Sequence, residues 1–366
     1  MPEKGAPPKV PPLQRRVLRA IRSFTSPLLP DDYLELINPL WSTRELRGQI
    51  VAIEPEAGDA ATVVIRPGYE WGGHVPGQYL RVGIDIDGRR HWRAYSLTSD
   101  PDRPDGCISI TPKKVEEGVV SPVFVRDHRL GAIIGLGGVE GEFVLPDPVP
   151  AKLLFVSAGS GITPIMSMLR SLDGENAVGE VVMLHSARTA DDVIFGRELR
   201  DLSRRHQGFR LHEQHTSEMG RLGPQHLDEL CPGWREREAY LSGPPEMLDA
   251  MDEHWQAHGD CERMHMERFQ PKLSATEEAQ GDGGTITFIT SKAETQSDGS
   301  TPILAAGEEA GLDLPFGCRE GICHTCVGEL GSGQVRDMRS GKVHGQEGEM
   351  IRTCINAPEG PIEIRL

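Results

Sequence analysis

The chain changes its pattern of hydrophobic and polar positions twice. Between residues 46 and 147, short runs of strand-forming residues are separated by Gly and Pro, at 49–54, 61–66, 78–84, 91–96 and 107–112. Short runs bounded by turn residues in this way indicate strands. Many short strands divided by turn residues predict an antiparallel β-barrel.

A second pattern occupies residues 148–270. Residues 152–157 form a continuous apolar run, followed by a glycine-rich loop, a helical segment and another apolar run at 180–185. Apolar strands that alternate with helices predict an α/β domain with a parallel sheet.

The third pattern covers residues 284–366. An alternating run at 285–290 predicts a strand, and Thr301-Pro302 opens a predicted helix that stops at Gly311. This mixture is typical of an α+β domain. Residues 271–283 are rich in Gly, Ser, Asp and Glu and are predicted to be the linker before it.

Residues 1–45 form an N-terminal extension that begins with a Pro-rich segment. Within residues 13–24, Leu13, Val17, Leu18, Ile21 and Phe24 fall at helical spacing among four arginines. A basic amphipathic helix is typical of an element that lies on a membrane surface, and docking on its own domain is the open alternative. A second short helix is predicted at 31–37.

Charge and composition narrow the function. The 366 residues carry a net charge of −16, which argues against a nucleic-acid partner. No run of eighteen apolar residues and no secretory signal pattern occurs, so we expect a cytoplasmic protein, with a peripheral location at the inner face of the membrane as the open alternative. Of the seven cysteines, Cys107, Cys231 and Cys261 are scattered and are expected to be buried small hydrophobic side chains.

The other four cysteines have a diagnostic spacing. Cys318, Cys323 and Cys326 are spaced C-x4-C-x2-C, and 27 residues separate Cys326 from Cys354. This is the plant-type [2Fe–2S] pattern, whereas structural zinc usually uses two C-x2-C pairs. Residues 284–366 resemble the plant-type ferredoxin family, which implies a β-grasp fold and these four thiolates as iron ligands.

In the predicted barrel, Arg93-Ala94-Tyr95-Ser96 is the informative run, with Pro76-Gly-Gln-Tyr79 upstream and Gly118-Val-Val120-Ser121 downstream. In this order the segments resemble the flavin domain of the ferredoxin–NADP reductase family. The resemblance implies that the arginine holds flavin phosphates, that the tyrosine lies against the ring and that the Ser96 hydroxyl reaches N5. Gly118, Val120 and Ser121 would contact the pyrophosphate of FAD. Ile110, Thr111 and Lys113 would line the flavin.

The glycine-rich loop of the α/β domain reads Gly159-Ser160-Gly161-Ile162-Thr163-Pro164. A strand, a glycine turn and a helix start form an anion-binding geometry. The sixth position is Pro164, as in the same reductase family, and this resemblance implies that Thr163 lies where nicotinamide approaches the flavin. A second segment, Ser242-Gly243-Pro244, has serine where the family usually has cysteine. The resemblance also places Arg188 along the dinucleotide and Phe269 near the flavin.

The choice between NADPH and NADH depends on residues 214–218, where this family meets the adenosine ribose. The hydroxyls of Thr216 and Ser217, with Arg188 and Arg221, favour a 2′-phosphate, whereas Glu218 favours NADH. We expect NADPH, with NADH as the alternative.

Together these segments predict a reductase that passes electrons from NAD(P)H to FAD, to [2Fe–2S] and to an external acceptor. The run 91–99 and the leader 32–40 closely resemble actinobacterial reductases that serve membrane acyl-CoA desaturases, which implies such an acceptor. The alternatives are the reductase of a Rieske oxygenase or of an alkane or steroid hydroxylase, and a redox sensor without turnover.

Overall fold

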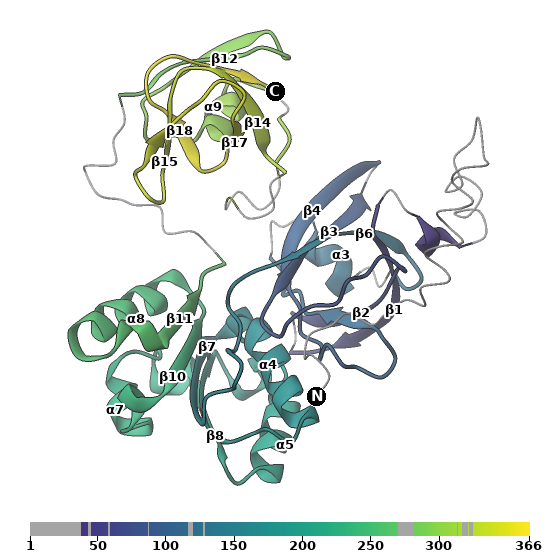
Figure 1. Ribbon diagram of the computed structural model, residues 1–366, viewed down its shortest axis with the longest axis vertical. Coiled ribbons are helices and arrows are strands. Elements are labelled where there is room, and N and C mark those ends of the chain that lie inside the picture. Colours follow the sequence, from purple (N-terminus) through teal and green to yellow (C-terminus); the bar gives the residue numbers. More distant parts are fainter. Residues whose placement is uncertain are drawn as a thin grey trace. The chain divides into compact units, whose positions relative to one another are not determined.

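The computed structural model describes residues 38–42, 45–57, 59–86, 88–115, 120–126, 129–269, 282–312, 314–316, 321 and 325–366. The predicted helices at 13–24 and 31–37, and most of the predicted linker, lie outside these residues. The described residues form two compact units. One contains the residues up to Arg90 together with Tyr95–Arg268, and the other contains His91–Ala94 together with Phe269–Leu366 (Figure 1).

The first unit begins with a short 3-10 turn, η1 (Pro39–Trp41), and an antiparallel barrel whose six-stranded sheet has the order β4-β3-β6-β1-β2-β5. An isolated bridge between Leu97 and Ile110 joins the two edges of this sheet. The barrel core contains Ile50, Ile65 and Leu80, with Phe124 of helix α3. The prediction of an antiparallel barrel is therefore confirmed. Its elements are β1 (Arg47–Pro55), β2 (Ala61–Pro67), β3 (Tyr79–Ile86), β4 (Arg89–Ser96), β5 (Ile108–Ile110), α3 (Ser121–Arg126) and β6 (Ile133–Glu140).

A five-stranded parallel sheet of order β11-β10-β7-β8-β9 follows, as the buried runs predicted. Its strands are β7 (Lys152–Ala158), β8 (Glu180–Ala187), β9 (Phe209–His215), β10 (Glu238–Ser242) and β11 (Met264–Glu267). The connecting elements are η2 (Gly159–Gly161), α4 (Ile162–Gly174), η3 (Ala190–Asp192), α5 (Gly196–Arg205), α6 (Thr216–Met219), α7 (Gln225–Leu230), η4 (Trp234–Glu236), α8 (Pro245–His258) and η5 (Cys261–Arg263).

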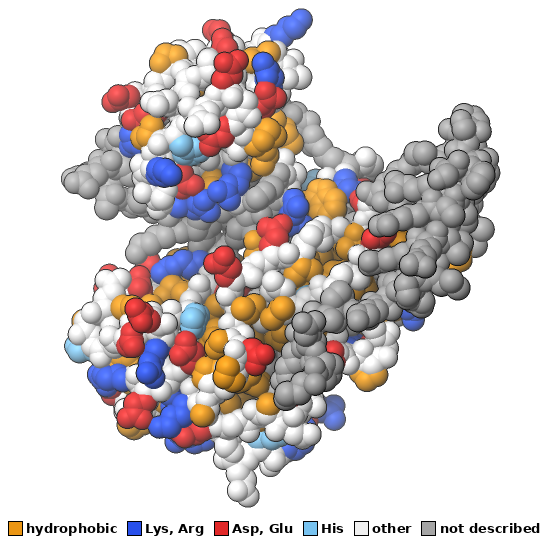
Figure 2. Space-filling model, in the orientation of Figure 1, with side chains coloured by type: hydrophobic (Ala, Val, Ile, Leu, Met, Phe, Trp, Pro, Cys, Tyr) orange, Lys and Arg blue, Asp and Glu red, His pale blue; other side chains and the backbone are white. Residues whose placement is uncertain are grey.

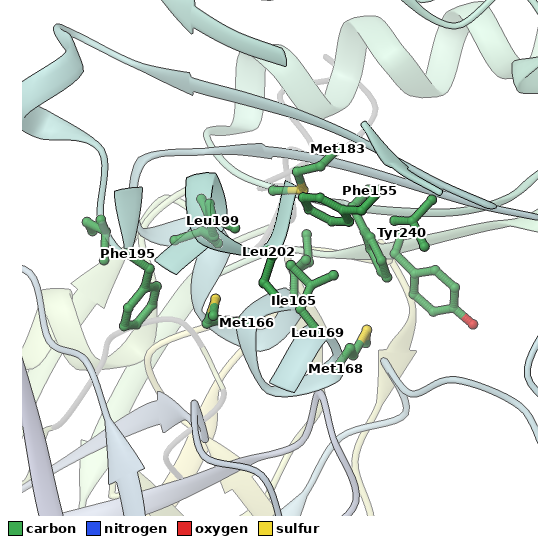
Figure 3. Packing of buried hydrophobic residues seen from close by; sticks show 14 of the residues in the cluster. Phe155, Ile165, Met166, Met168, Leu169, Met183, Phe195, Leu199, Leu202 and Tyr240 are labelled. Atoms are coloured by element: carbon green, nitrogen blue, oxygen red, sulfur yellow. The ribbon is translucent and has the colours of Figure 1, made fainter. Parts of the chain in front are cut away.

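Both faces of this sheet are covered, which explains why its strands β7 and β8 are apolar over most of their length. On one face, Phe155 and Met183 pack against Ile165 of α4 and Leu199 of α5 (Figure 3). On the other face, α7 and α8 cover the alternate side chains of the same strands, including Leu154, Val156, Val182 and Leu184.

The barrel and the parallel sheet are joined by specific bonds within the first unit. Tyr240 stands in the apolar cluster with its hydroxyl pointing away from the neighbouring side chains (Figure 3), and that hydroxyl donates to Val144 O at 3.1 Å. The rings of Tyr240 and Phe143 meet edge to face, with centroids 5.4 Å apart. Ser167 of α4 donates to Ser99 O at 2.7 Å.

The second unit is a mixed sheet of order β13-β12-β19-β14-β17 with helix α9, beside a small sheet of order β16-β15-β18. The central pair, β12 and β19, is parallel, and Phe288, Ile303 and Ile364 lie in the core. The predicted α+β architecture is confirmed. Its elements are β12 (Gly284–Phe288), β13 (Ala293–Ser297), α9 (Ile303–Glu309), β14 (Val327–Ser332), β15 (Val335–Asp337), β16 (Val343–His344), β17 (Met350–Arg352), β18 (Asn356–Pro358) and β19 (Ile362–Arg365).

Exposure, charge and hydropathy of the described residues add three findings. Cys107 and Cys231 are buried as expected, but Cys261 is exposed in η5, so that prediction was wrong. Acidic and basic side chains are interspersed on the face of the second unit in Figure 2, and some are paired, as are Arg336 and Glu359. Among the described residues, no helix combines the length and the apolar character needed to cross a bilayer.

Candidate functional site

The glycine turn predicted to hold the nucleotide lies where β7 ends, at the carboxyl edge of the parallel sheet. Gly159 has a φ of 54°, a left-handed conformation that favours glycine, and η2 leads directly into α4. Thr163, which is 5% exposed, donates from Oγ1 to Ser160 O at 2.9 Å. The turn therefore leads into the amino end of α4 at Ile162, and the amino end of a helix favours a bound phosphate, although Pro164 has no N–H to contribute.

The second predicted nucleotide segment lies against this turn. β10 is parallel to β7, with Ser242 opposite Ser157. A Cβ atom at Gly161 would overlap Ser242 O, and a Cβ atom at Gly243 would lie 2.6 Å from Met247 Cε. At Gly161 the overlap is with backbone, so only glycine allows this close approach, whereas the nearest backbone atom at Gly243 is Ala158 N, at 3.2 Å. The structure thus brings 159–164 together with Ser242, Gly243 and Pro244.

Of two further polar groups at this edge, the sequence singled out Ser242 only as a departure from the family pattern and did not identify Glu267 as a site residue. Ser242 is fully buried, and its Oγ has no hydrogen-bond partner among the described residues. Glu267 is opposite Ser242 in the β10–β11 pair, and its buried Oε2 also has no such partner. Burial raises the pKa of Glu267 to about 8. The signal that identifies Glu267 is a carboxyl group that ends a short strand beside the Gly243-Pro244 segment.

A third polar group, His185 of β8, is buried beside the same strand end. Its Nδ1 lies 2.7 Å from Ser157 Oγ. Burial lowers the pKa of His185 to about 4, so the ring is neutral at physiological pH. We interpret this pair as a neutral hydrogen bond that fixes the end of β7 where the turn begins.

The predicted adenosine end lies where β8 and β9 finish. The Arg188 side chain is 79% exposed, and its Nε lies 3.4 Å from Asp192 Oδ2. The Ser217 amide donates to Arg188 O at 3.1 Å, so the predicted cation and hydroxyl segment are adjacent. Gln214 Nε2 donates to Met219 O at 3.0 Å and so holds α6 in place.

The predicted flavin residues occupy the end of β4 and the neighbouring β5. Tyr95 meets Phe124 edge to face, with centroids 6.0 Å apart, and Ser96 is 6% exposed. Arg93 is half-buried, and its Nη1 donates to Trp92 O at 2.8 Å. Ala94, which lies between Arg93 and Tyr95 in the sequence, is also half-buried. These side chains define a strand end with a cation, an aromatic ring and a hydroxyl.

Most of the other predicted flavin residues have buried side chains. Ile110 and Val120 lie in the barrel core, so any contact that they make with a flavin is through their backbone. Thr111 is buried, and Lys113 Nζ lies 3.4 Å from Asp59 Oδ2. Ser121 begins α3, and its Oγ accepts from the Val115 amide at 3.0 Å. Gly118 lies outside the described residues.

The cluster loop is described in part. Cys326 Sγ and Cys354 Sγ are 3.0 Å apart, and the Gly321 amide donates to Cys354 Sγ at 3.2 Å. Gly321 has a φ of 72°, and a Cβ atom there would overlap Ile355. Arg352 Nη1 donates to Gly321 O at 2.8 Å. Cys318 and Cys323 lie outside the described residues.

These donor sets fit the predicted groups. Two thiolates with a backbone N–H directed at one sulfur suit an iron–sulfur cluster, whose potential depends on such bonds. A glycine turn at the amino end of α4 suits a dinucleotide pyrophosphate. Phe269 is half-buried and begins the second unit, so its predicted contact with flavin stays a prediction.

Family models match all three regions of the chain. The oxidoreductase FAD-binding domain matches residues 69–145, the oxidoreductase NAD-binding domain matches 155–253, and the 2Fe-2S iron-sulfur cluster binding domain matches 287–359. Their order is the order that the sequence predicted.

Comparisons with whole proteins agree. The chain is 47% identical over 342 residues to an NADPH oxidoreductase of Mycobacterium tuberculosis H37Rv, covering 92% of this chain and 88% of the relative. It is 32% identical over 318 residues to the glycine betaine monooxygenase reductase subunit of Pseudomonas aeruginosa UCBPP-PA14, covering 79% and 86%. Phthalate dioxygenase reductase has the same fold, with a TM-score of 0.59 at 22% identity, over 87% of this chain and 97% of that one.

Proposed function

The chain belongs to the ferredoxin reductase family with FAD-binding, NAD-binding and [2Fe–2S] domains, and on that premise we propose its donor, its acceptor and the residues that serve each step. The protein is an oxidoreductase that moves electrons from NAD(P)H through FAD to the cluster. When bound, FAD would supply two-electron chemistry toward the nicotinamide and one-electron chemistry toward the cluster.

For the hydride step we assign catalytic roles to Ser96 and Thr163. Ser96 ends β4, and its hydroxyl would donate to flavin N5. Thr163 opens α4 beside Gly161, where its buried hydroxyl is fixed on Ser160 O. The observation that carries the proposal is the close approach of Gly161 to Ser242, which joins both nucleotide segments in the unit that also holds Tyr95 and Ser96.

The remaining predicted residues would bind rather than react. Arg93 and Ser121 would hold phosphates of FAD, and Tyr95 would cover its ring. Cys318, Cys323, Cys326 and Cys354 would ligate the two irons.

We propose NADPH as the donor. The support is the backbone hydrogen bond from the Ser217 amide to Arg188 O, which brings the segment of Thr216 and Ser217 beside the residue that carries an exposed guanidinium. A 2′-phosphate is a strong hydrogen-bond acceptor and suits such a group. The 47% identical relative is an NADPH oxidoreductase, which agrees with this proposal.

For the acceptor, our first candidate is a membrane di-iron acyl-CoA desaturase. Its support is the resemblance of residues 32–40 and 91–99 to reductases of that kind, with the basic segment 13–24 as a peripheral membrane contact. The second candidate is an oxygenase component, because a relative at 32% identity is a monooxygenase reductase subunit. Both candidates use the same route as far as the cluster.

The test combines the purified protein, NADPH, membranes that carry a co-occurring acyl-CoA desaturase, stearoyl-CoA and oxygen, and it measures oleate. We expect oleate with the wild-type protein and none with Cys354→Ser. If membranes with active desaturase yield no oleate while NADPH still reduces the cluster, the desaturase candidate fails and the oxygenase candidate stands. A protein whose flavin is not reduced by NADPH would refute the reductase function itself.

A further inference from the structure

Arg170 of α4 bonds both to the barrel segment that follows β4 and to helix α5 of the nucleotide domain. Its Nη1 donates to Thr98 O at 2.6 Å. Its Nε and Nη2 donate to the two carboxylate oxygens of Glu198 in α5, at 2.9 and 2.6 Å. The guanidinium carbon lies 4.9 Å from the centroid of the Phe195 ring. One side chain therefore fixes α4 to α5 and both helices to the end of a barrel strand.

A second route of hydrogen bonds joins Thr98 to the same helices. The Thr98 Oγ1 lies 3.4 Å from Thr111 Oγ1, which lies 2.9 Å from Thr62 Oγ1. Thr62 donates to Glu56 Oε1 at 2.8 Å, and the Phe195 amide donates to Glu56 Oε2 at 3.3 Å. We call these residues, with Arg170 and Glu198, the junction ring, because the two routes from Thr98 both end at Phe195.

The backbone conformation of Phe195 indicates that the junction ring constrains this residue. Phe195 has a φ of 59°, a left-handed conformation that bulky residues rarely adopt. Its side chain lies at one edge of the apolar cluster, apart from Tyr240 at the other (Figure 3). The hydrogen bond from the Phe195 amide to Glu56 and the Arg170 guanidinium above the Phe195 aromatic ring both constrain this residue. Such backbone conformations persist only where the surroundings over-determine them.

The two segments that Arg170 connects indicate its role. Thr98 follows Ser96 by two residues, so the carbonyl that Arg170 holds belongs to the segment that continues from the flavin strand. Thr163 precedes Arg170 by seven residues on one helix, about 10 Å along its axis. A rigid helix transmits any shift of Arg170 to the nicotinamide turn.

We propose that Arg170 is a positioning residue that sets the distance between the nicotinamide turn and the flavin strand. This rests on the proposed hydride transfer, whose rate is sensitive to geometry: a misplacement of about 1 Å can cost roughly a hundredfold. Arg170 itself touches neither reacting group in this scheme. It acts by holding Thr98 to α4.

The test variant is Arg170→Met, which keeps an unbranched apolar side chain and removes the guanidinium. Glu198 is 38% exposed and borders an open cavity of about 660 Å³ with Glu56 and Phe195, so its carboxylate stays hydrated in the variant. The matched control is Arg205→Met. Arg205 makes the same kind of two-pronged ion pair, to Asp173 at 2.9 and 2.9 Å, between the same two helices.

Three quantities are measured: the dissociation constant of NADP⁺, the single-turnover rate of flavin reduction with the charge-transfer absorbance of the nicotinamide complex, and amide hydrogen exchange of residues 95–99. For Arg170→Met we expect unchanged NADP⁺ affinity, a rate lower by about ten- to a hundredfold, a weaker charge-transfer band and faster exchange at Leu97 and Thr98. Arg205→Met should leave all three unchanged.

A wild-type rate and band in Arg170→Met would overturn the proposal, as would an equal loss in Arg205→Met. If Arg170→Met does not retain FAD, Glu198→Gln serves instead, because it weakens the anchor of the guanidinium and leaves the Thr98 bond possible; it should give a smaller change in the same direction. If NADPH does not reduce the wild-type flavin, the proposed function fails, and hydrogen exchange still decides whether Arg170 holds the junction.

Discussion

The cysteine loop of the second unit and the hydride site of the first bring their reactive groups together by different means. Three of the four predicted iron ligands fall within nine residues of sequence, Cys318–Cys326, and the fourth arrives on the turn after β17. The proposed hydride site instead draws on the end of β4 and on the turn after β7, which contacts the end of β10. The first arrangement is set by local spacing, and the second depends on how two domains pack.

This difference follows from what each step requires. Transfer of a single electron tolerates some variation in the distance between donor and acceptor. Transfer of a hydride requires the donor carbon of the nicotinamide and the acceptor nitrogen of the flavin to lie in near contact. Accordingly, few side-chain hydrogen bonds hold the described part of the cluster loop. Several hold the barrel to the nucleotide domain, including those of Ser167, Arg170 and Tyr240.

The largest expected effect separates the two sites completely. Cys354→Ser removes a predicted iron ligand that is 6% exposed and that accepts the Gly321 amide. We expect cluster absorbance and cytochrome c reduction to fall to background, while NADPH still reduces the flavin at the wild-type rate. Absorbance spectra and stopped-flow traces measure both. Cys261→Ser, at an exposed cysteine of the first unit, is the control and should change neither. A variant that keeps its cluster would remove Cys354 from the ligand set.

The next effect concerns the nucleotide half alone. In Gly161→Ala the new methyl group overlaps Ser242 O, so the turn or β10 must shift. Overpacking of this kind costs about 1–3 kcal/mol, and we expect NADPH binding to weaken roughly ten- to a hundredfold, with flavin and cluster spectra intact. Titration calorimetry measures the affinity. Gly233→Ala, where no atom lies within 4 Å of the new methyl, should bind like wild type, and equal weakening in both variants would speak against the close approach.

A smaller effect is pH-dependent and confined to the first unit. Burial raises the folded-state pKa of Glu267 to about 8, above its ordinary value of 4.5. Between these values the folded state binds more protons than the unfolded state, so stability decreases as pH rises, by at most about 1.4 kcal/mol per pH unit. Urea unfolding from pH 5 to 9 should show this slope in the wild type and a flatter one in Glu267→Gln. Parallel curves for the two proteins would mean that Glu267 is ionised in the folded state.

The smallest effect tests the coenzyme preference. Arg188 is 79% exposed, so its contact with a 2′-phosphate is screened by solvent and contributes about 1 kcal/mol, roughly fivefold in affinity. Arg188→Ala should raise the KM for NADPH by that factor and leave the KM for NADH unchanged. Arg197→Ala, at an exposed arginine of α5, is the control. Equal effects on both coenzymes would argue against a 2′-phosphate at Arg188.

Local patterns predicted most of the architecture. The short run at 61–66 and the apolar run at 152–157 correspond to β2 and β7, and Thr301-Pro302 opens α9. The glycine turn could be predicted because a left-handed Gly159 followed by a helix is a local arrangement.

The junction could not be predicted in the same way. The bond from Arg170 to Thr98 joins residues 72 apart, and in the sequence Arg170 is one of many charged residues on helices. Glu267 was invisible for a related reason: its burial depends on β10 beside it, and not on its neighbours in sequence. The only sequence feature that marks Glu267 is a carboxyl group at the end of a short strand.

The most direct test of the central claim is an anaerobic stopped-flow experiment with one equivalent of NADPH, run on the wild type and on Cys354→Ser. The account predicts that flavin absorbance decreases first in both proteins, and that in the wild type cluster absorbance then decreases as the flavin is reoxidised. A cluster that is reduced before the flavin, or at the same rate in a protein whose flavin has been removed, would contradict the proposed order of transfer.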